Sequence, residues 1–133
     1  MNLKGLKINF LGDSITYGHG TSATEKRFVT RLAEEYGAIT RCYGISGTRL
    51  ARQVKPSLNA QFDLDFPSRV ETMDPDADLV VVFGGTNDFG HGDAPFGEFS
   101  DRTADTFCGA LPELYPLLDS CPAAVLGEIL LKI

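Results

Sequence analysis

Apolar residues recur in short runs along this chain, and several of these runs predict β-strands. Alternating apolar positions predict a first strand at Leu6–Leu11. The continuous β-branched and apolar run Leu79–Phe83 predicts a central strand that is buried on both faces. Two further runs predict strands at Ala38–Tyr43 and Ala123–Leu131.

Helical spacing of apolar residues appears between these strands. It predicts a helix at Lys26–Tyr36, and the capping-box sequence Ser68–Glu71 predicts the start of a short one. A third helix is expected within residues 103–118, where Pro112 and Pro116 predict a kink or a break, because an interior proline costs about 3 kcal/mol. The alternation of strands and helices predicts an α/β sandwich with a mainly parallel sheet.

Three of the predicted strands end in loops of glycine and polar residues. These loops contain Gly12-Asp13-Ser14, Ile45-Ser46-Gly47 and Gly85-Thr86-Asn87. The carboxyl ends of parallel strands share one edge of the sheet, and ligands bind at that edge. Each loop alone is better explained as a plain turn, and a Ser/Thr-rich first loop could also cradle a phosphate. Their convergence favours a functional site, in which the serine is a nucleophile if a base and oxyanion donors are present.

Composition narrows the classes of function. The chain has 133 residues, 43% hydrophobic and 23% charged, as expected of one soluble globular domain. A net charge of −6 without a basic patch argues against nucleic acid as a partner. No run has the length of a signal peptide or a membrane span, which predicts a cytoplasmic protein without a membrane partner.

The cysteines and histidines predict neither disulfides nor a metal site. Cys42, Cys108 and Cys121 are far apart and odd in number, so we expect buried free thiols in a reducing cytosol. The two histidines and three scattered cysteines lack the spacing of metal ligands. We therefore expect no metal and no cofactor.

The three loops also resemble the sequence blocks of the SGNH (GDSL) hydrolases. Phe10–Thr16 resembles the first block, whose serine is the nucleophile. Ile45–Gly47 resembles the second block, whose glycine supplies a backbone N–H, and Gly84–Asp88 resembles the third, whose asparagine supplies a side-chain N–H. The resemblance covers residues 8–92. It implies a flavodoxin-like three-layer α/β/α sandwich and hydrolysis of esters.

The resemblance assigns roles to individual residues. Ser14 would be the nucleophile, and the N–H groups of Ser14, Gly47 and the Asn87 side chain would form the oxyanion hole, in one shallow pocket. The residues expected to contact substrate are Asp13, Thr86, Asp88 and His91. The expected substrate is a small acyl ester, hydrolysed by an esterase, lipase or deacetylase.

The general base of the family is a C-terminal histidine, usually with an aspartate three residues before it. No such pair is expected anywhere in this chain, whose resemblance to the family fades over Cys121–Glu128. We therefore expect residues 1–133 to be a single SGNH hydrolase-like domain without its C-terminal part, through truncation or a frameshift. His19 and His91 are the remaining histidines, and His91 is favoured as a pocket-lining residue.

A missing C-terminal part has two consequences. Apolar faces would be uncovered, which predicts self-association. Without its base, the chain is either an impaired esterase or a catalytically inert binding protein for an acylated or carbohydrate ligand. A flavodoxin-like phosphate or nucleotide binder is the third hypothesis.

Overall fold

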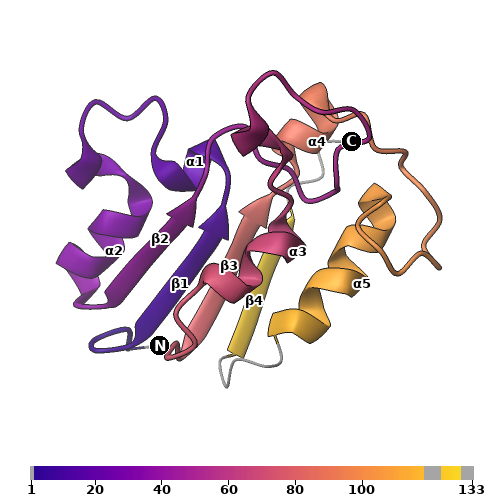
Figure 1. The fold of residues 1–133 in the computed structure, drawn as a ribbon. Coiled ribbons are helices and arrows are strands. Elements are labelled where there is room, and N and C mark those ends of the chain that lie inside the picture. The colour runs from indigo at the N-terminus through magenta and orange to yellow at the C-terminus, as the bar shows by residue number, and fades with distance from the viewer. Residues whose placement is uncertain (1, 119–123, 130–133) are drawn as a thin grey trace.

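The computed structural model describes residues 2–118 and 124–129, which include a parallel four-stranded sheet (Figure 1). The spatial order is β2-β1-β3-β4. The strands are β1 (Lys7–Gly12), β2 (Ile39–Gly44), β3 (Leu79–Gly84) and β4 (Ala124–Ile129). All four predicted strands are present, with ends shifted by one or two residues. The predicted ends of the last strand, Ala123 and Leu131, lie outside the described residues.

The register of the sheet aligns the carboxyl ends of the three strands that precede the polar loops. Gly12 of β1 is paired with Gly44 of β2 on one side and with Phe83 of β3 on the other. Because all three strands are parallel, their loops leave the sheet at the same edge. The predicted convergence of these loops at one edge is confirmed.

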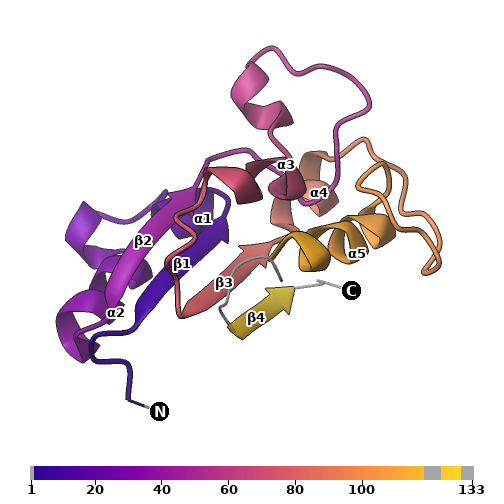
Figure 2. The same cartoon turned by 60° about the horizontal axis from the view of Figure 1, so that its bottom comes forward.

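Helices cover the two faces of the sheet, which gives the α/β/α sandwich expected from the sequence. Helix α2 (Phe28–Tyr36) packs on one face, where Val29 contacts the cluster that contains Ile8 and Phe10. Helices α3 (Phe66–Arg69) and α5 (Phe107–Leu118) pack on the other face (Figures 1 and 2). The two faces follow directly from the alternation of side chains along each strand.

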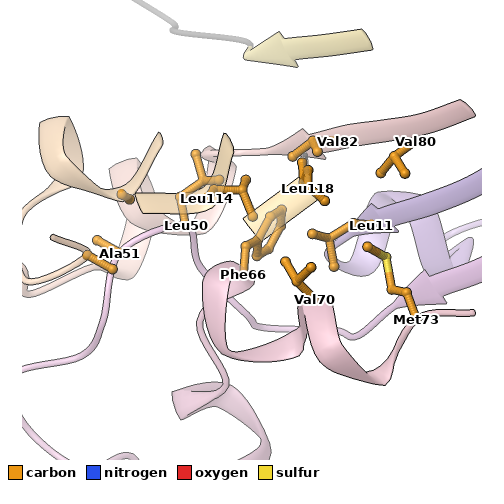
Figure 3. Packing of buried hydrophobic residues seen from close by; sticks show 12 residues of the cluster. Leu11, Leu50, Ala51, Phe66, Val70, Met73, Val80, Val82, Leu114 and Leu118 are labelled. Atoms are coloured by element: carbon orange, nitrogen blue, oxygen red, sulfur yellow. The ribbon is translucent and has the colours of Figure 1, made fainter. Parts of the chain in front are cut away.

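The larger core lies between the sheet and helices α3 and α5 (Figure 3). Val80 and Val82 of β3 have exposed fractions of 0% and 2%, as predicted for a central strand. They pack in one cluster with Phe66, Leu114 and Leu118 from the helices. Full burial of such a side chain contributes about 1.5–3 kcal/mol, so this cluster accounts for much of the cohesion between the sheet and its helices.

The shorter elements lie mostly in the loops at the carboxyl edge. They are α1 (Ser14–Tyr17), η1 (Thr24–Lys26), η2 (Ala60–Asp63), η3 (Val70–Thr72) and α4 (Thr86–His91). One expectation is corrected here. The helix expected at Lys26–Tyr36 begins at Phe28, and residues 24–26 form a separate 3₁₀ turn ahead of it.

The predicted capping box is wrong. Helix α3 begins before Ser68, and its N-cap is Asp65, whose carboxylate accepts a hydrogen bond of 2.9 Å from the Ser68 N–H. Pro67 lies in the first turn of α3, where its missing N–H has no helical partner to lose. Ser68 is thus inside the helix that it was expected to cap.

Helix α5 is a single helix that continues through Pro112 and Pro116. The two prolines are four residues apart and therefore share one face of the helix. Ala110, Leu114 and Leu118 are fully buried on the opposite side. Burial of this apolar face offsets the cost of the prolines, so the helix is not broken at either of them.

Cys42 and Cys108 are free thiols, but both are only half-buried, so their predicted burial is wrong. Cys42 lies on the edge strand β2, where only one side of the strand is paired. Cys121 lies outside the described residues. No helix in the described part of the chain is long and apolar enough to span a membrane.

The central position of β3 leads to a direct test. Val82→Asp should prevent soluble expression, because an unpaired carboxylate at this buried position costs several kcal/mol. Leu58→Asp is the control, since Leu58 is fully exposed and its replacement should leave expression unchanged. The soluble yield of both variants is measured by expression screening, and their folding is measured by circular dichroism of the soluble fraction. A folded Val82→Asp protein would show that β3 is not essential to the core.

Candidate active site

Ser14 is the first residue of α1, directly after the turn that ends β1. Asp13 caps this short helix, because its carboxylate accepts a hydrogen bond of 2.9 Å from the Ile15 N–H. The Asp13 side chain is only 1% exposed, and its other oxygen is buried without a hydrogen-bond partner. Burial raises the pKa of Asp13 above its ordinary value. Asp13 thus fixes the turn that presents Ser14, which is itself only partly buried.

Gly47 follows β2 in a conformation that favours glycine, with φ of +81°. A Cβ at this position would also overlap the ring of Phe62. Both constraints keep the backbone of this loop free of a side chain. The N–H of Gly47 donates to no acceptor within the described part of the chain, and neither does that of Ser14. Two backbone donors are therefore free in the loops after β1 and β2.

Asn87 connects the loop after β3 with the loop after β2. Its side-chain N–H₂ donates a hydrogen bond of 2.9 Å to the carbonyl oxygen of Thr48, the residue after Gly47. An amide group has two N–H donors, so one remains for another acceptor. The geometry therefore ties Asn87 to the segment that carries Gly47.

Asp88 strengthens the same connection. Its two carboxylate oxygens accept hydrogen bonds from the backbone N–H groups of Leu50 (2.9 Å) and Ala51 (2.8 Å). Burial is the largest influence on this carboxyl and raises its pKa, although the hydrogen bonds act in the opposite direction. Both carboxylate oxygens of Asp88 thus fix the backbone of the segment after β2, at Leu50 and Ala51.

A buried guanidinium, not identified from the sequence, lies beneath these loops. Arg69 donates hydrogen bonds to the carbonyl oxygens of Tyr43 (2.9 Å) and Gly12 (3.1 Å) and to the Thr48 hydroxyl (3.2 Å). Its guanidinium carbon also lies 4.6 Å from the centre of the Phe66 ring. Arg69 therefore joins the ends of β1 and β2 to the loop that carries Gly47.

The charge of Arg69 is maintained by nearby carboxylates. Burial lowers its pKa to about 10, while Asp65 and Asp13 act in the opposite direction. A pKa of about 10 still leaves the guanidinium charged at neutral pH. No signal in the sequence distinguishes this arginine from a surface one, because its acceptors come from distant strands.

The histidines and Thr86 are exposed at this edge. Thr86 and His91 are the first and last residues of α4, and His19 follows α1. In the described structure, neither histidine side chain makes a hydrogen bond or an ion pair. The sequence does contain one Asp-x-x-His spacing, Asp88 to His91, so its expected absence holds only for the C-terminal region. This spacing forms no dyad here, since Asp88 is bonded to backbone N–H groups.

A pocket of about 630 Å³ lies beside these loops. It is lined by Tyr17, Gly44, Ile45, Ser46, Gln61 and Leu64. None of these residues was predicted to bind substrate, and Ser14, Gly47 and Asn87 do not line it. Two of the lining residues are close in the chain to predicted site residues. Tyr17 follows Ser14 in α1, and Ser46 directly precedes Gly47. The sequence could not reveal this pocket, because Gln61 of η2 is distant in the chain from Gly44 of β2 and approaches it only on folding.

A serine hydroxyl at the same sheet edge as free N–H donors is an arrangement suited to acyl transfer. A model of the GDSL-like Lipase/Acylhydrolase family matches residues 10–125. The chain belongs to this family. The match includes all three loops, so the resemblance expected from the sequence is confirmed. No match was found among curated proteins.

Solved structures agree with this assignment to the GDSL-like family. A Lactobacillus plantarum protein is 30% identical, with a TM-score of 0.72, over 95% of this chain and 57% of its own. A candidate GDSL-like lipase from Bacteroides uniformis is 23% identical (TM-score 0.74; 92% and 70% coverage). A mutant of the esterase AlinE4 is 19% identical (TM-score 0.63; 93% and 58% coverage). The last two show the fold alone. The chain spans just over half the length of the L. plantarum protein.

The role of Arg69 in this GDSL-like fold can be tested by stability. Arg69→Ala should lower the free energy of unfolding by roughly 3–5 kcal/mol, because it removes three hydrogen bonds of a buried guanidinium and the positive charge that faces Asp65 and Asp13. Urea denaturation followed by circular dichroism measures the change. Arg31→Ala is the control, since Arg31 pairs only with Glu35 on the surface of α2 and should be dispensable. Equal stability of the two variants would contradict the structural role of Arg69.

The buried carboxyl of Asp13 should give a pH-dependent effect. Because its pKa is raised in the folded state, the folded protein holds a proton that the unfolded chain releases as the pH rises above about 3.8. Ionisation of Asp13 therefore destabilises the fold, and Asp13→Asn should gain stability relative to wild type as the pH rises through this window. Urea denaturation between about pH 3 and pH 6 measures the difference.

Asp93→Asn is the matched control for the sign of this effect. Hydrogen bonds from the Val54 and Lys55 N–H groups lower the pKa of Asp93, so its contribution to stability is lost as the pH falls below about 3.8. Asp93→Asn lacks this carboxylate, so it should lose stability relative to wild type as the pH rises toward about 3.8. If both variants gained stability relative to wild type as the pH rises, or both lost it, the environments assigned to Asp13 and Asp93 would be wrong.

Proposed function

We propose that this chain carries the nucleophile of a serine ester hydrolase that acts on small acyl esters. Ser14 attacks the ester carbonyl. The backbone N–H groups of Ser14 and Gly47 and the free N–H of the Asn87 side chain stabilise the oxyanion that forms. The oxyanion collapses with release of the alcohol and leaves the acyl group on Ser14, and water then hydrolyses this acyl-enzyme to the acid and free Ser14.

The observation that carries the proposal is the level alignment of three strand ends. Gly12 is paired with both Gly44 and Phe83, so the loops with Ser14, Gly47 and Asn87 leave one edge. Two of these loops are bound to each other by the hydrogen bond from Asn87 to Thr48. Donors held in this way need no reorganisation when charge develops on the substrate, which is the basis of their effect on rate.

The weakest part of the arrangement is the base. A serine hydroxyl is a poor nucleophile until a base accepts its proton. His19 and His91 are exposed, and neither has a side-chain partner in the described structure that would orient its ring. We therefore propose that neither serves as the base, and that this chain is an impaired hydrolase on its own.

The resulting prediction is slow turnover of p-nitrophenyl acetate. Loss of the triad histidine costs on the order of 10⁶ in turnover, and the remaining groups give roughly 10³–10⁴ over water. Purified wild type is compared with His19→Ala and His91→Ala in a spectrophotometric assay. All three should be equally slow. Normal esterase turnover that one histidine variant abolishes would identify that histidine as the base.

A second measurement tests Ser14 without relying on an internal base. Added imidazole supplies one, and mass spectrometry then follows labelling by a serine-directed phosphonate. Labelling should occur at Ser14, accelerate with imidazole, be absent in Ser14→Ala and slow roughly 10²-fold in Asn87→Ala. Absence of labelling at Ser14 would overturn the hydrolase and leave a binding protein with the same fold.

A further inference from the structure

Two residues that line the pocket are close in the chain to residues of the proposed site. Tyr17 lies three residues after Ser14 in α1, and helical residues at this spacing are neighbours, with Cβ atoms about 5–6 Å apart. Ser46 directly precedes Gly47 in the chain. A ligand in this pocket would therefore lie beside the loops that carry Ser14 and Gly47.

The wall between α1 and β2 is held in place by close backbone packing. A Cβ at Gly44 would overlap the backbone N of Tyr17. This contact brings α1 against the end of β2 and leaves no space for a side chain at that point. The position of Tyr17 at the edge of the pocket thus depends on the glycine.

The side chains that line the pocket combine apolar surfaces with hydrogen-bonding groups that have no partner. Ile45 and Leu64 are apolar, and Tyr17 presents its ring with an exposed fraction of 57%. The hydroxyl groups of Tyr17 and Ser46 and the amide of Gln61 have no hydrogen-bond partner within the part of the chain that the structure describes. Three polar groups are therefore available to a ligand.

This combination of apolar and polar side chains favours the alcohol half of an ester over its acyl half. An acyl chain offers only CH₂ groups and would cover the three polar groups without pairing them, which costs free energy. A polyhydroxylated ring offers hydroxyl groups for the polar side chains and C–H groups for the apolar ones. A pocket of about 630 Å³ is also within the range of sites that enclose small ligands.

We propose that this pocket binds the alcohol half of the ester and that this alcohol is a sugar ring, with Ser46 and Gln61 as specificity-determining residues. This proposal rests on the proposed function, because only an ester hydrolase has an alcohol to bind. It makes the substrate of the chain an acylated sugar.

Binding can be measured without turnover. Methyl β-glucoside is titrated into isotope-labelled protein, and hexanoate is titrated as the acyl-like alternative. Methyl β-glucoside should shift the amide resonances of Tyr17, Ile45 and Gln61, while hexanoate should not. Ser46→Ala and Gln61→Leu should each weaken the binding about three- to tenfold, the effect of one hydrogen bond. Ser22→Ala is the matched control, since Ser22 is exposed in the loop after α1 and should bind like wild type.

Ser14→Ala separates failure of this proposal from failure of the hydrolase. It should bind methyl β-glucoside like wild type. Sugar binding without phosphonate labelling of Ser14 supports the sugar site and overturns the hydrolase. Shifts caused by hexanoate alone, or no shifts with either probe, overturn the sugar site and leave the hydrolase to its own test. Sugar binding that neither pocket variant weakens also overturns the assignment of Ser46 and Gln61.

Discussion

The buried guanidinium of Arg69 is the interaction on which the carboxyl edge of this fold depends. It binds the backbone carbonyls of Gly12 and Tyr43, at the ends of two neighbouring strands, and the hydroxyl of Thr48 in the following loop. The Gly12 carbonyl oxygen also accepts a hydrogen bond of 3.1 Å from the Ile45 N–H, so Arg69 supplies a further donor at this edge. One planar cation with several donors connects the two strand ends with the following loop. Its desolvation is offset by Asp65 and Asp13.

The remaining ties at this edge run between loops. Asn87 donates to Thr48, and Asp88 accepts from Leu50 and Ala51, so the segment after β2 is held by the segment after β3. Arg49 continues this pattern, since it is nearly buried and donates to the carbonyl oxygen of His91. Loops fixed in this way keep their N–H donors in one orientation, which oxyanion stabilisation requires. The proposed chemistry of the site thus depends on polar contacts that are distant in sequence.

The glycines at this edge set how closely the loops approach. Gly44 admits the backbone of α1, and Gly47 accommodates the Phe62 ring while keeping a positive φ. Gly44 and Tyr17, which meet in this packing, also line the adjoining pocket. Substrate selection and catalysis, as proposed, would then share one set of backbone contacts.

The sequence by itself determined the strands, the parallel α/β class and the convergence of three polar loops, because side-chain alternation and apolar runs are local properties. It also determined the family, since the motifs with Ser14, Gly47 and Asn87 are short and contiguous. Tertiary structure decided what local patterns cannot express. Asp65, not Ser68, caps α3, and α5 continues through two prolines because its opposite face is buried. Arg69, Asp88 and the pocket beside Tyr17 acquire their roles from partners that only folding brings near, which no spacing along the chain encodes.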